Sequence, residues 1–435
     1  MRVILLAFTA AVWLGTGLLM LPNARRGPGG ASFMEAFFTA TSAICVTGLT
    51  VVDTQHHWTH FGQAVIMALI QVGGFGVMTI ATFVGLTVLE KLSLRSRLTV
   101  ATEAHVDGPG SVSGVLGAIV RTTLIIEAGI AALLALRLWW GHDYRLPSAL
   151  WRGAFHAVSS FNNAGFALYN DNLEGFVDDP WICLPIALAT ILGGLGFPVL
   201  MQLMKHHLDL VKWSMNTRLV LAITPVLLLS GWIFIAVLEW NNPGTLGPLE
   251  WPDKLLASFF HSVQTRTSGF NSIDIGSVHS ATLLGMDVLM FIGGGPAGTA
   301  GGIKITTFGV LFFIIWTELR GDTAVNVFGK RLSRAVHRQA ISVALLAVAL
   351  VVTATMTLLL LTPFRLDDVL FEVVSAFGTV GLSTGITPAL DPISQLTLCF
   401  LMYVGRLGPI TFASALALKH RKRVYDLPKE RPIIG

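Results

Sequence analysis

Charged side chains are scarce in this chain. Asp, Glu, Lys and Arg make up 12% of its 435 residues, whereas hydrophobic residues make up 53%. A soluble globular protein carries about 25% charged residues. The shortage excludes an ordinary soluble domain, and the mean hydropathy of +0.69 favours a membrane protein.

Cysteine is also scarce, with only Cys45, Cys183 and Cys399. An odd count without the spacing of metal ligands argues against a disulfide framework or a structural metal site. Cys183 and Cys399 are interpreted as packing residues. A signal-peptide pattern is missing as well. Residues 3–21 are apolar, but their start is weakly basic and Leu21-Pro22-Asn23 is a poor cleavage site, so a retained helix is expected.

The basic residues gather in four groups between apolar stretches, and many acidic residues lie in the other loops. By the positive-inside bias, the basic groups and both chain termini are expected in the cytoplasm. Binding to nucleic acid or anionic lipid explains the groups less well, because they alternate with apolar stretches. The groups are Lys91, Arg95 and Arg97; Lys205, Lys212 and Arg218; Arg320, Lys330, Arg331, Arg334 and Arg338; and Lys419, Arg421, Lys422 and Arg423.

Four segments share a pattern in which a phenylalanine precedes a glycine by ten residues. They cover residues 38–48, 155–165, 259–269 and 371–381. The last contains Gly378-Thr379-Val380-Gly381, close to the TVGYG signature of potassium-channel selectivity filters. A cation pore of that kind is lined by four such segments. Four copies with one spacing argue against ordinary loops with chance glycines.

The surrounding apolar stretches predict an all-α integral membrane protein with four repeats of helix, pore helix, Gly segment and helix. First helices are expected at 3–21, 112–140, 219–240 and 341–361, and second helices at 61–89, 182–211, 283–319 and 393–418. These are eight spanning helices. Stretches between them, such as 148–161 and 252–264, are too short and polar to span and are expected to re-enter the membrane. The repeats are expected at residues 1–90, 112–211, 218–319 and 338–419, followed by a cytoplasmic tail at 420–435.

The Gly segments predict a site for a dehydrated potassium ion, because backbone carbonyls can replace its water shell. Glycine adopts the dihedral angles that aim successive carbonyls inward. Each pore helix directs its partly negative carbonyl end toward the axis, so no carboxylate is needed. The predicted ring is Gly48, Gly165, Gly269 and Gly381, with further layers from Val46, Thr47, Asn163, Ala164, Thr267, Ser268, Thr379 and Val380.

These segments carry a family resemblance. Residues 41–50, 162–166, 265–271 and 379–383 resemble the four filter segments of the Trk/Ktr/HKT potassium transporter superfamily, and the resemblance covers nearly the whole chain. The direct start at the first helix is most similar to the bacterial Ktr-type membrane subunits. The resemblance implies potassium uptake across the bacterial cell membrane, generally stimulated by sodium, by a protein that is not an enzyme.

Residues 293–302 are the most unusual stretch. Glycine and proline cost a helix interior about 1 and about 3 kcal/mol relative to alanine, so the helix is expected to unwind here. The resemblance implies that the stretch is an intramembrane gate below the filter. Its members are Gly293, Gly294, Gly295, Pro296, Ala297, Gly298, Thr299, Ala300, Gly301 and Gly302.

Arg406 stands where the other repeats have Gly74, Gly194 and Gly294. A buried arginine in a membrane helix is expensive, so it is a functional hypothesis by default. Its expected partners are the freed carbonyls of residues 293–302. The resemblance implies a gating role, and a purely structural role is the alternative.

Other polar residues in membrane segments are expected to be structural. Arg266 is expected to point behind the third filter and donate to carbonyls that brace the strand. Satisfied buried hydrogen bonds are expected for His156, His261, Glu127 and Glu372.

Other functions fit less well. Gly293-x-Gly295-x-x-Gly298 matches a dinucleotide fingerprint, which requires a soluble βαβ unit. Gly381-x-Ser383-x-Gly385 matches a nucleophile elbow and would suggest an intramembrane serine hydrolase, but no His and carboxylate pair is evident beside it. A passive scaffold leaves the Gly segments unexplained. Transport of sodium or mixed monovalent cations stays open, although in the resembling superfamily a serine at the first ring position accompanies sodium permeation, and here it is Gly48.

Partners are implied by the resemblance alone. The chain has no room for a nucleotide-binding domain. The resembling family forms membrane homodimers that carry a separate soluble nucleotide-binding ring (KtrA-like) on the cytoplasmic face, and residues 428–435 are a candidate for the dimer contact. Membrane lipid is expected around the chain and nucleic acid is not. The expected bound ions are potassium and, as a second candidate, sodium.

Overall fold

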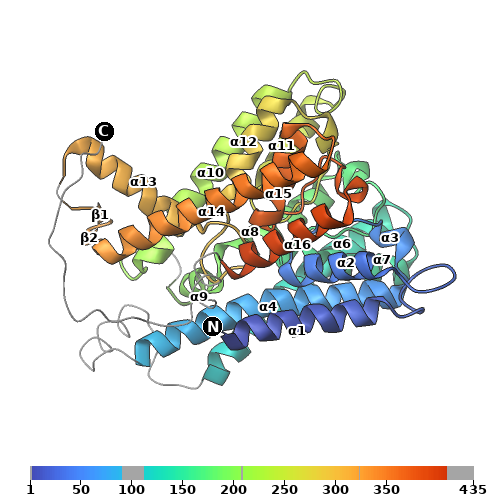
Figure 1. Cartoon of the computed structure of the whole chain (residues 1–435), viewed down its shortest axis with the longest axis horizontal. Helices are drawn as coiled ribbons and strands as arrows, with labels where there is room; N and C mark the ends of the chain where they lie inside the picture. Colours follow the sequence, from blue (N-terminus) through green and yellow to red (C-terminus); the bar gives the residue numbers. More distant parts are fainter. Residues whose placement is uncertain (1, 91–111, 207–208, 323, 409–435) are drawn as a thin grey trace.

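The computed structural model describes residues 2–90, 112–206, 209–322 and 324–408. Figure 1 shows an all-helical body in these residues, apart from one short hairpin that pairs β1 (Asn326–Val327) with β2 (Lys330–Arg331). The basic groups at 91–97 and 419–423, the end of the last expected span and the tail at 420–435 lie outside the described residues.

Long apolar helices form where the sequence predicts the first helix of each repeat. They begin and end within a few residues of the expected bounds, except that the fourth begins seven residues earlier than expected. They are α1 (Arg2–Leu19), α6 (Val112–Gly141), α10 (Met215–Glu239) and α14 (Arg334–Leu361).

A short helix follows each long one, and its second half is buried. The sequence marks the start of the first of these helices with a capping box, in which Glu35 accepts from the Ser32 backbone N–H at 2.8 Å and donates its own N–H to the Ser32 hydroxyl. Two others begin with proline in the first turn. The four are α2 (Phe33–Cys45), α7 (Leu146–Phe161), α11 (Trp251–Gln264) and α15 (Leu366–Gly378).

A third set of helices completes the body, together with single turns in the loops. The longer ones are α4 (His60–Glu90), α8 (Pro180–Leu195), α9 (Phe197–His206), α12 (Ser280–Phe291), α13 (Ile305–Arg320) and α16 (Pro392–Leu407). The single turns are α3 (Thr54–His57), η1 (Glu174–Phe176), η2 (Ile275–Ser277) and η3 (Thr387–Ala389).

One stretch that was predicted to form a single continuous helix is divided into two helices. The stretch 182–211 was expected to form one span, but α8 ends at Leu195 and α9 leaves at an angle of 98°. The bend lies at Gly196, whose φ is +92°, a conformation that glycine adopts without the penalty of a Cβ atom. The predicted break in 283–319 is confirmed, because α12 ends at Phe291 and α13 begins at Ile305.

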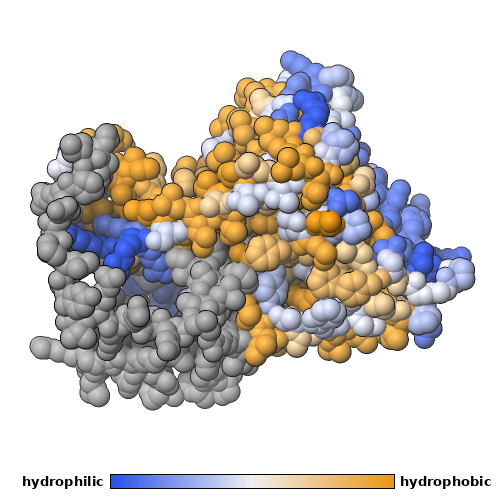
Figure 2. All heavy atoms as spheres, in the orientation of Figure 1, coloured by the Kyte–Doolittle hydropathy of each residue, from blue (hydrophilic) through white to orange (hydrophobic). Residues whose placement is uncertain are grey.

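The described helices have the apolar character of membrane segments. By length and composition, three of them are able to span a bilayer, and the bent pair α8 and α9 is a fourth candidate. Large apolar side chains are exposed along α10 and α14, among them Ile233, Val237, Leu345 and Leu360. In Figure 2 hydrophobic residues cover most of the visible face, and hydrophilic ones gather over the loops at its right-hand end.

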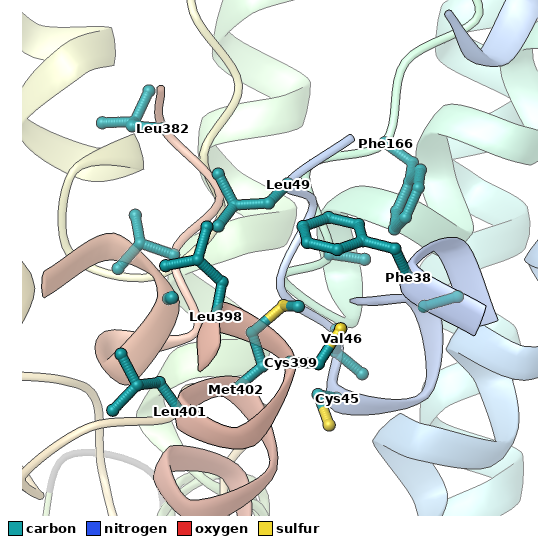
Figure 3. Close-up of a cluster of buried hydrophobic side chains, with 14 of the residues drawn as sticks. Phe38, Cys45, Val46, Leu49, Phe166, Leu382, Leu398, Cys399, Leu401 and Met402 are labelled. Carbon is teal, nitrogen blue, oxygen red and sulfur yellow. The ribbon is translucent and has the colours of Figure 1, made fainter. Parts of the chain in front are cut away.

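The core lies around the short helices. Figure 3 shows Phe38, Cys45 and Leu49 in one buried cluster with Leu398, Cys399 and Met402 of α16. Cys183 and Cys399, predicted to be packing residues, are buried and free. The cluster holds the chain that follows α2 against α16, which belongs to the other end of the sequence.

Candidate functional site

The Gly segments meet in a closed ring. A Cβ atom added to any of the four glycines would overlap the backbone carbonyl oxygen of the residue that precedes the next glycine. The order around the ring is the order in the sequence, and the last glycine contacts the first segment. The pairs are Gly48 with Ala164, Gly165 with Ser268, Gly269 with Val380, and Gly381 with Thr47. Only glycine fits at these positions.

The backbone of the ring is left-handed where the sequence predicts glycine to be needed. The four φ angles are +99°, +70°, +70° and +97° in chain order. The residue two before the glycine is also left-handed in three segments, namely Val46, Asn163 and Thr379, with φ between +48° and +60°. Thr267 of the third segment is the exception. Each glycine is followed by a buried apolar side chain, which fixes the strand from behind: Leu49, Phe166, Phe270 and Leu382.

The third segment is one residue shorter between its buried phenylalanine and its ring glycine. In the other segments the residue before the glycine donates its N–H to a carbonyl five residues earlier, as Ala164 does to Ser159. Ser268 instead donates to Gln264, four residues earlier. The fully buried phenylalanine is accordingly Phe260, whereas Phe259 is half-buried and packs on Trp232. The predicted equivalence of Phe259 with Phe38, Phe155 and Phe371 is therefore wrong by one residue.

The ring lies at the carbonyl ends of the four short helices. A helix C-terminus carries roughly half a negative charge, so four of them favour a cation. No Asp or Glu occurs in residues 46–48, 163–165, 267–269 or 379–381. Any ion held here would be bound by backbone oxygens. Within the described residues no group of three His, Cys, Asp or Glu side chains offers a metal site.

Residues 293–302 form an irregular loop between α12 and α13, packed under the ring. The Gly301 backbone is so close to the fourth segment that a Cβ atom there would overlap the Thr379 side chain. On the other side the loop pairs with the end of α8. The Gly295 N–H donates to the Gly194 carbonyl at 2.7 Å, and the Thr299 N–H donates to the Gly193 carbonyl at 3.2 Å. No motif in the sequence predicts this second contact.

Arg406 of α16 reaches the loop. It is 3% exposed, and one guanidinium nitrogen donates to the Thr299 carbonyl. Another donates to the Gly73 carbonyl of α4 at 3.1 Å. The predicted contact with freed carbonyls of this stretch is confirmed. The arginine ties together three elements that are far apart in the sequence.

Two more cations donate to the same loop. Arg266 lies beside the third ring glycine but donates to the Gly293 carbonyl at 3.3 Å. It was expected to brace the filter strand, and instead it holds the start of the loop. Lys304 donates to the Ala300 carbonyl. Three basic side chains, those of Arg266, Lys304 and Arg406, therefore donate to the loop. The ring segments above it contain no acidic residue.

A buried carboxylate supports the second segment. Glu127 of α6 accepts from the Asn162 side chain at 2.9 Å and from Gln71 of α4 at 3.2 Å. Asn162 also donates to the side-chain Oε1 of Gln71 at 3.1 Å. The expected satisfied hydrogen bonds of Glu127 are confirmed. Its hydrogen bond to Asn162, at the end of α7, could not be predicted from the sequence, because it depends on how α4, α6 and α7 pack together.

Ser383 is not arranged as a nucleophile. Its hydroxyl donates to the Glu372 carboxylate and lies 3.0 Å from the Thr387 hydroxyl. A nucleophilic serine needs a base, usually histidine, to take its proton. No histidine contact of Ser383 is present among the described residues.

The described ring, loop and arginine can be compared with known proteins. A family model described as a cation transport protein, TrkH, matches residues 23–424. The chain belongs to the TrkH family. TrkH-family relatives include the Ktr system potassium uptake protein B of Bacillus subtilis, 38% identical over 97% of this chain and 94% of its own length. The protein of that name from Vibrio alginolyticus is 37% identical over 96% and 91%.

Two further TrkH-family comparisons extend these. The potassium/sodium uptake protein NtpJ of Enterococcus hirae is 33% identical over all of this chain and 97% of its own length. The crystal structure of the potassium transporter TrkH from Vibrio parahaemolyticus superposes with a TM-score of 0.74 at 17% identity. It covers 95% of this chain and 84% of the other. The fold is therefore that of the TrkH family, and the protein is a multi-pass membrane protein.

Proposed function

We propose that this protein takes up potassium across the bacterial cell membrane, with both termini in the cytoplasm. The observation that carries the proposal is the closed ring of four glycines, in which each glycine lies against a backbone carbonyl oxygen of the next segment and four short helices end at the ring. The names of the TrkH-family relatives support potassium as the ion. The proposed filter comprises the ring with residues 46, 47, 163, 164, 267, 268, 379 and 380.

The proposed architecture has four repeats and eight spans. The repeats occupy residues 1–90, 112–211, 218–319 and 338–419, and each contributes one short helix and one ring glycine. The regular alternation of long and short helices supports this division. A single chain thereby supplies a pseudo-fourfold pore, with residues 420–435 as a cytoplasmic tail.

The 293–302 loop and Arg406 are the proposed gate. The loop lies under the ring and is held by backbone contacts with α8, by Arg266, which follows α11, and by Arg406 of α16. The positive charge of Arg406 raises the electrostatic barrier for a cation leaving the ring. Opening requires the loop to move away from Thr379 and from the pore axis.

Sodium and partner subunits belong to the same proposal. The relatives' names place them in Ktr systems, so a homodimer with a soluble nucleotide-binding ring on its cytoplasmic face is the proposed assembly. Sodium stimulation, or mixed potassium and sodium transport as the alternative function, is supported by the name of NtpJ.

The decisive experiment is ion flux in proteoliposomes made with the purified protein. Potassium flux should be measured with and without sodium and with and without a membrane potential. Potassium uptake that exceeds sodium uptake is the expected result. Equal fluxes would favour the mixed-cation alternative, and the absence of flux in both the free protein and its complex would contradict the proposal.

A further inference from the structure

Each short helix carries a polar residue directly after its buried phenylalanine. The four residues are at most 2% exposed, and neither the proposed ring nor the proposed gate uses them. They lie in the short helices that precede the Gly segments. They are Thr39, His156, His261 and Glu372.

Three of these side chains hold the strand that leaves the ring. In each case the acceptor is a side-chain atom, and the donor is the backbone N–H of the third residue after the ring glycine. His156 Nε2 accepts from Leu168 at 3.2 Å, and His261 Nε2 accepts from Ser272 at 3.1 Å. Glu372 Oε1 accepts from Thr384 at 3.2 Å. We name these three contacts the outer clamps.

The surroundings of His156 fix its ring. Its Nδ1 lies 2.7 Å from the Arg152 carbonyl oxygen, so Nδ1 carries the proton and Nε2 has a free lone pair for Leu168. The ring stacks on Tyr169 with centroids 4.9 Å apart. It also lies 6.2 Å from Phe270, which follows the third ring glycine. This clamp therefore touches two neighbouring segments.

Glu372 forms the most extensive clamp. Besides Thr384, its carboxylate accepts from the hydroxyls of Ser383 and Thr387, the latter at 2.8 Å. The Ser383 oxygen in turn accepts from the Gly385 N–H at 2.9 Å. One side chain thus organises the whole turn that follows the fourth ring glycine.

The first segment lacks a clamp. Thr39 occupies the equivalent position, but its hydroxyl has no hydrogen-bond partner among the described residues. Its side chain is also two bonds shorter than that of a histidine or glutamate. The four quarters of the ring are therefore supported unequally.

We propose that His156, His261 and Glu372 are positioning residues for ion selection, and that Thr39 has no such role. The inference rests on the proposed potassium filter and names the residues that hold it. A filter distinguishes ions by the placement of its oxygens, and groups that orient ligands need support from a second layer of contacts. A clamp anchors the strand three residues beyond the ring glycine and so limits how far the ring oxygens shift toward a smaller ion.

The test compares matched variants of the full chain in proteoliposomes. His261→Gln and Glu372→Gln keep an acceptor oxygen close to the native position. His261→Leu and Glu372→Leu remove it, and His261→Asn keeps a polar group that is too short to reach Ser272. Thr39→Val is the control, because it removes a hydroxyl that bonds to nothing described. Potassium flux and its competition by sodium give the KM, the maximal rate and the selectivity ratio.

The Leu and Asn variants should lose potassium over sodium selectivity by about tenfold, through a raised KM for potassium, while the Gln variants and Thr39→Val stay near wild type. Wild-type selectivity in His261→Leu and Glu372→Leu, or an equal loss in Thr39→Val, would overturn the proposal. If the Leu variants do not fold, the comparison of His261→Asn with His261→Gln decides. An inactive wild-type protein would instead reject the proposed function, whatever the variants do.

Discussion

At the scale of single residues, the ring glycines combine two constraints. Each has a positive φ, and each lies against a carbonyl of the neighbouring segment. A side chain there would both strain the backbone and push one of the four strands outward. The ring therefore responds to a single added methyl group, although that group carries no charge.

Gly48→Ser is predicted to lower discrimination between potassium and sodium, because its Cβ atom would displace the Ala164 carbonyl from the ring. A loss of severalfold or more should appear as sodium competition in proteoliposome flux. Gly17→Ala is the matched control, since Gly17 has open space around it and no positive φ. Retained selectivity in Gly48→Ser would remove Gly48 from the filter.

The glycines of the ring could be predicted from the sequence, because their spacing from a preceding phenylalanine repeats four times. The residues that support the ring could not be predicted in this way. His156, His261 and Glu372 were expected only to be satisfied inside the membrane. This is confirmed for His156 and Glu372, whereas His261 accepts through Nε2 but its buried Nδ1 has no partner among the described residues. Their shared role depends on which strand each short helix packs against. These contacts between a short helix and the strand after the ring form only in the folded chain.

At the scale of elements, the interrupted helix between α12 and α13 is the least regular part of the body. Its backbone groups are satisfied by neighbours rather than by its own helix, as irregular backbone inside a membrane requires. Arg406 of α16 reaches it through a hydrogen bond to the Thr299 carbonyl. Removing that contact should free the loop without disturbing the ring.

Arg406→Gln is accordingly predicted to raise potassium flux or change the apparent affinity, because the neutral side chain weakens both the tether to Thr299 and the positive barrier. Uptake kinetics in a transport-deficient host provide the measurement. Arg365→Gln is the control, because that side chain is exposed and pairs with Asp367 at the surface. Unchanged kinetics in Arg406→Gln would reduce Arg406 to a structural support.

The start of α8 gives a prediction about stability. Asp179 caps this helix through the Trp181 N–H at 2.9 Å and contacts Arg137 and His142 at 2.8 Å each. Burial raises the pKa of the Asp179 carboxyl, but hydrogen bonds from His142, Arg137 and the Trp181 backbone outweigh it and leave the pKa below its usual value. The ionised form therefore stabilises the folded protein.

Asp179→Asn should lower stability by about 1 kcal/mol at neutral pH, because asparagine still caps the helix but loses the charged contacts. Because the pKa of Asp179 is lower in the folded protein, its ionised carboxylate stabilises the fold at any pH above its pKa in the unfolded chain, about 3.9. This stabilisation is lost as the pH falls through the pKa of Asp179 in the folded protein. The difference from wild type in thermal unfolding should be constant above about pH 5 and shrink below about pH 4. Asp171→Asn, at an exposed loop position, should show no such difference.

Element bounds were predictable for the long helices, but two local errors have physical causes. The spacing from Phe259 to Gly269 repeats the pattern of the other segments. Phe260 is nevertheless the buried residue, because Ser268 donates to a carbonyl four residues earlier, whereas its counterparts donate to carbonyls five residues earlier. The bend at Gly196 was missed because the sequence shows similar glycines at residues 73–76. Those glycines stay helical in α4. Whether such a glycine bends depends on what packs against it, here the 293–302 loop.

At the scale of the whole molecule, hydrophilic residues lie over the loops at the right-hand end of the hydrophobic face in Figure 2. The hairpin of β1 and β2 carries the exposed Lys330 and Arg331. The proposed orientation places Asp171 outside and Arg331 in the cytoplasm. Both side chains are exposed. The three native cysteines are buried, so they give little background in thiol labelling.

Single cysteines introduced as Asp171→Cys and Arg331→Cys test that orientation. A membrane-impermeant maleimide added to intact cells should label the first variant and not the second, and permeabilised cells should label both. The unsubstituted chain is the control. Labelling of Arg331→Cys in intact cells would invert the proposed topology.

The contact of Gly381 with Thr47 also bears on how the protein is made. The ring closes between the first and last segments, and Arg406 reaches Gly73, 333 residues earlier in the chain. A chain leaving the ribosome exposes its N-terminal segments first. Three of the ring segments are therefore synthesised before the fourth, and the closing segment and Arg406 are added near the end of synthesis. A chain that terminates before Gly381 therefore has no complete ring, and one that terminates before Arg406 lacks the hydrogen bond to the 293–302 loop.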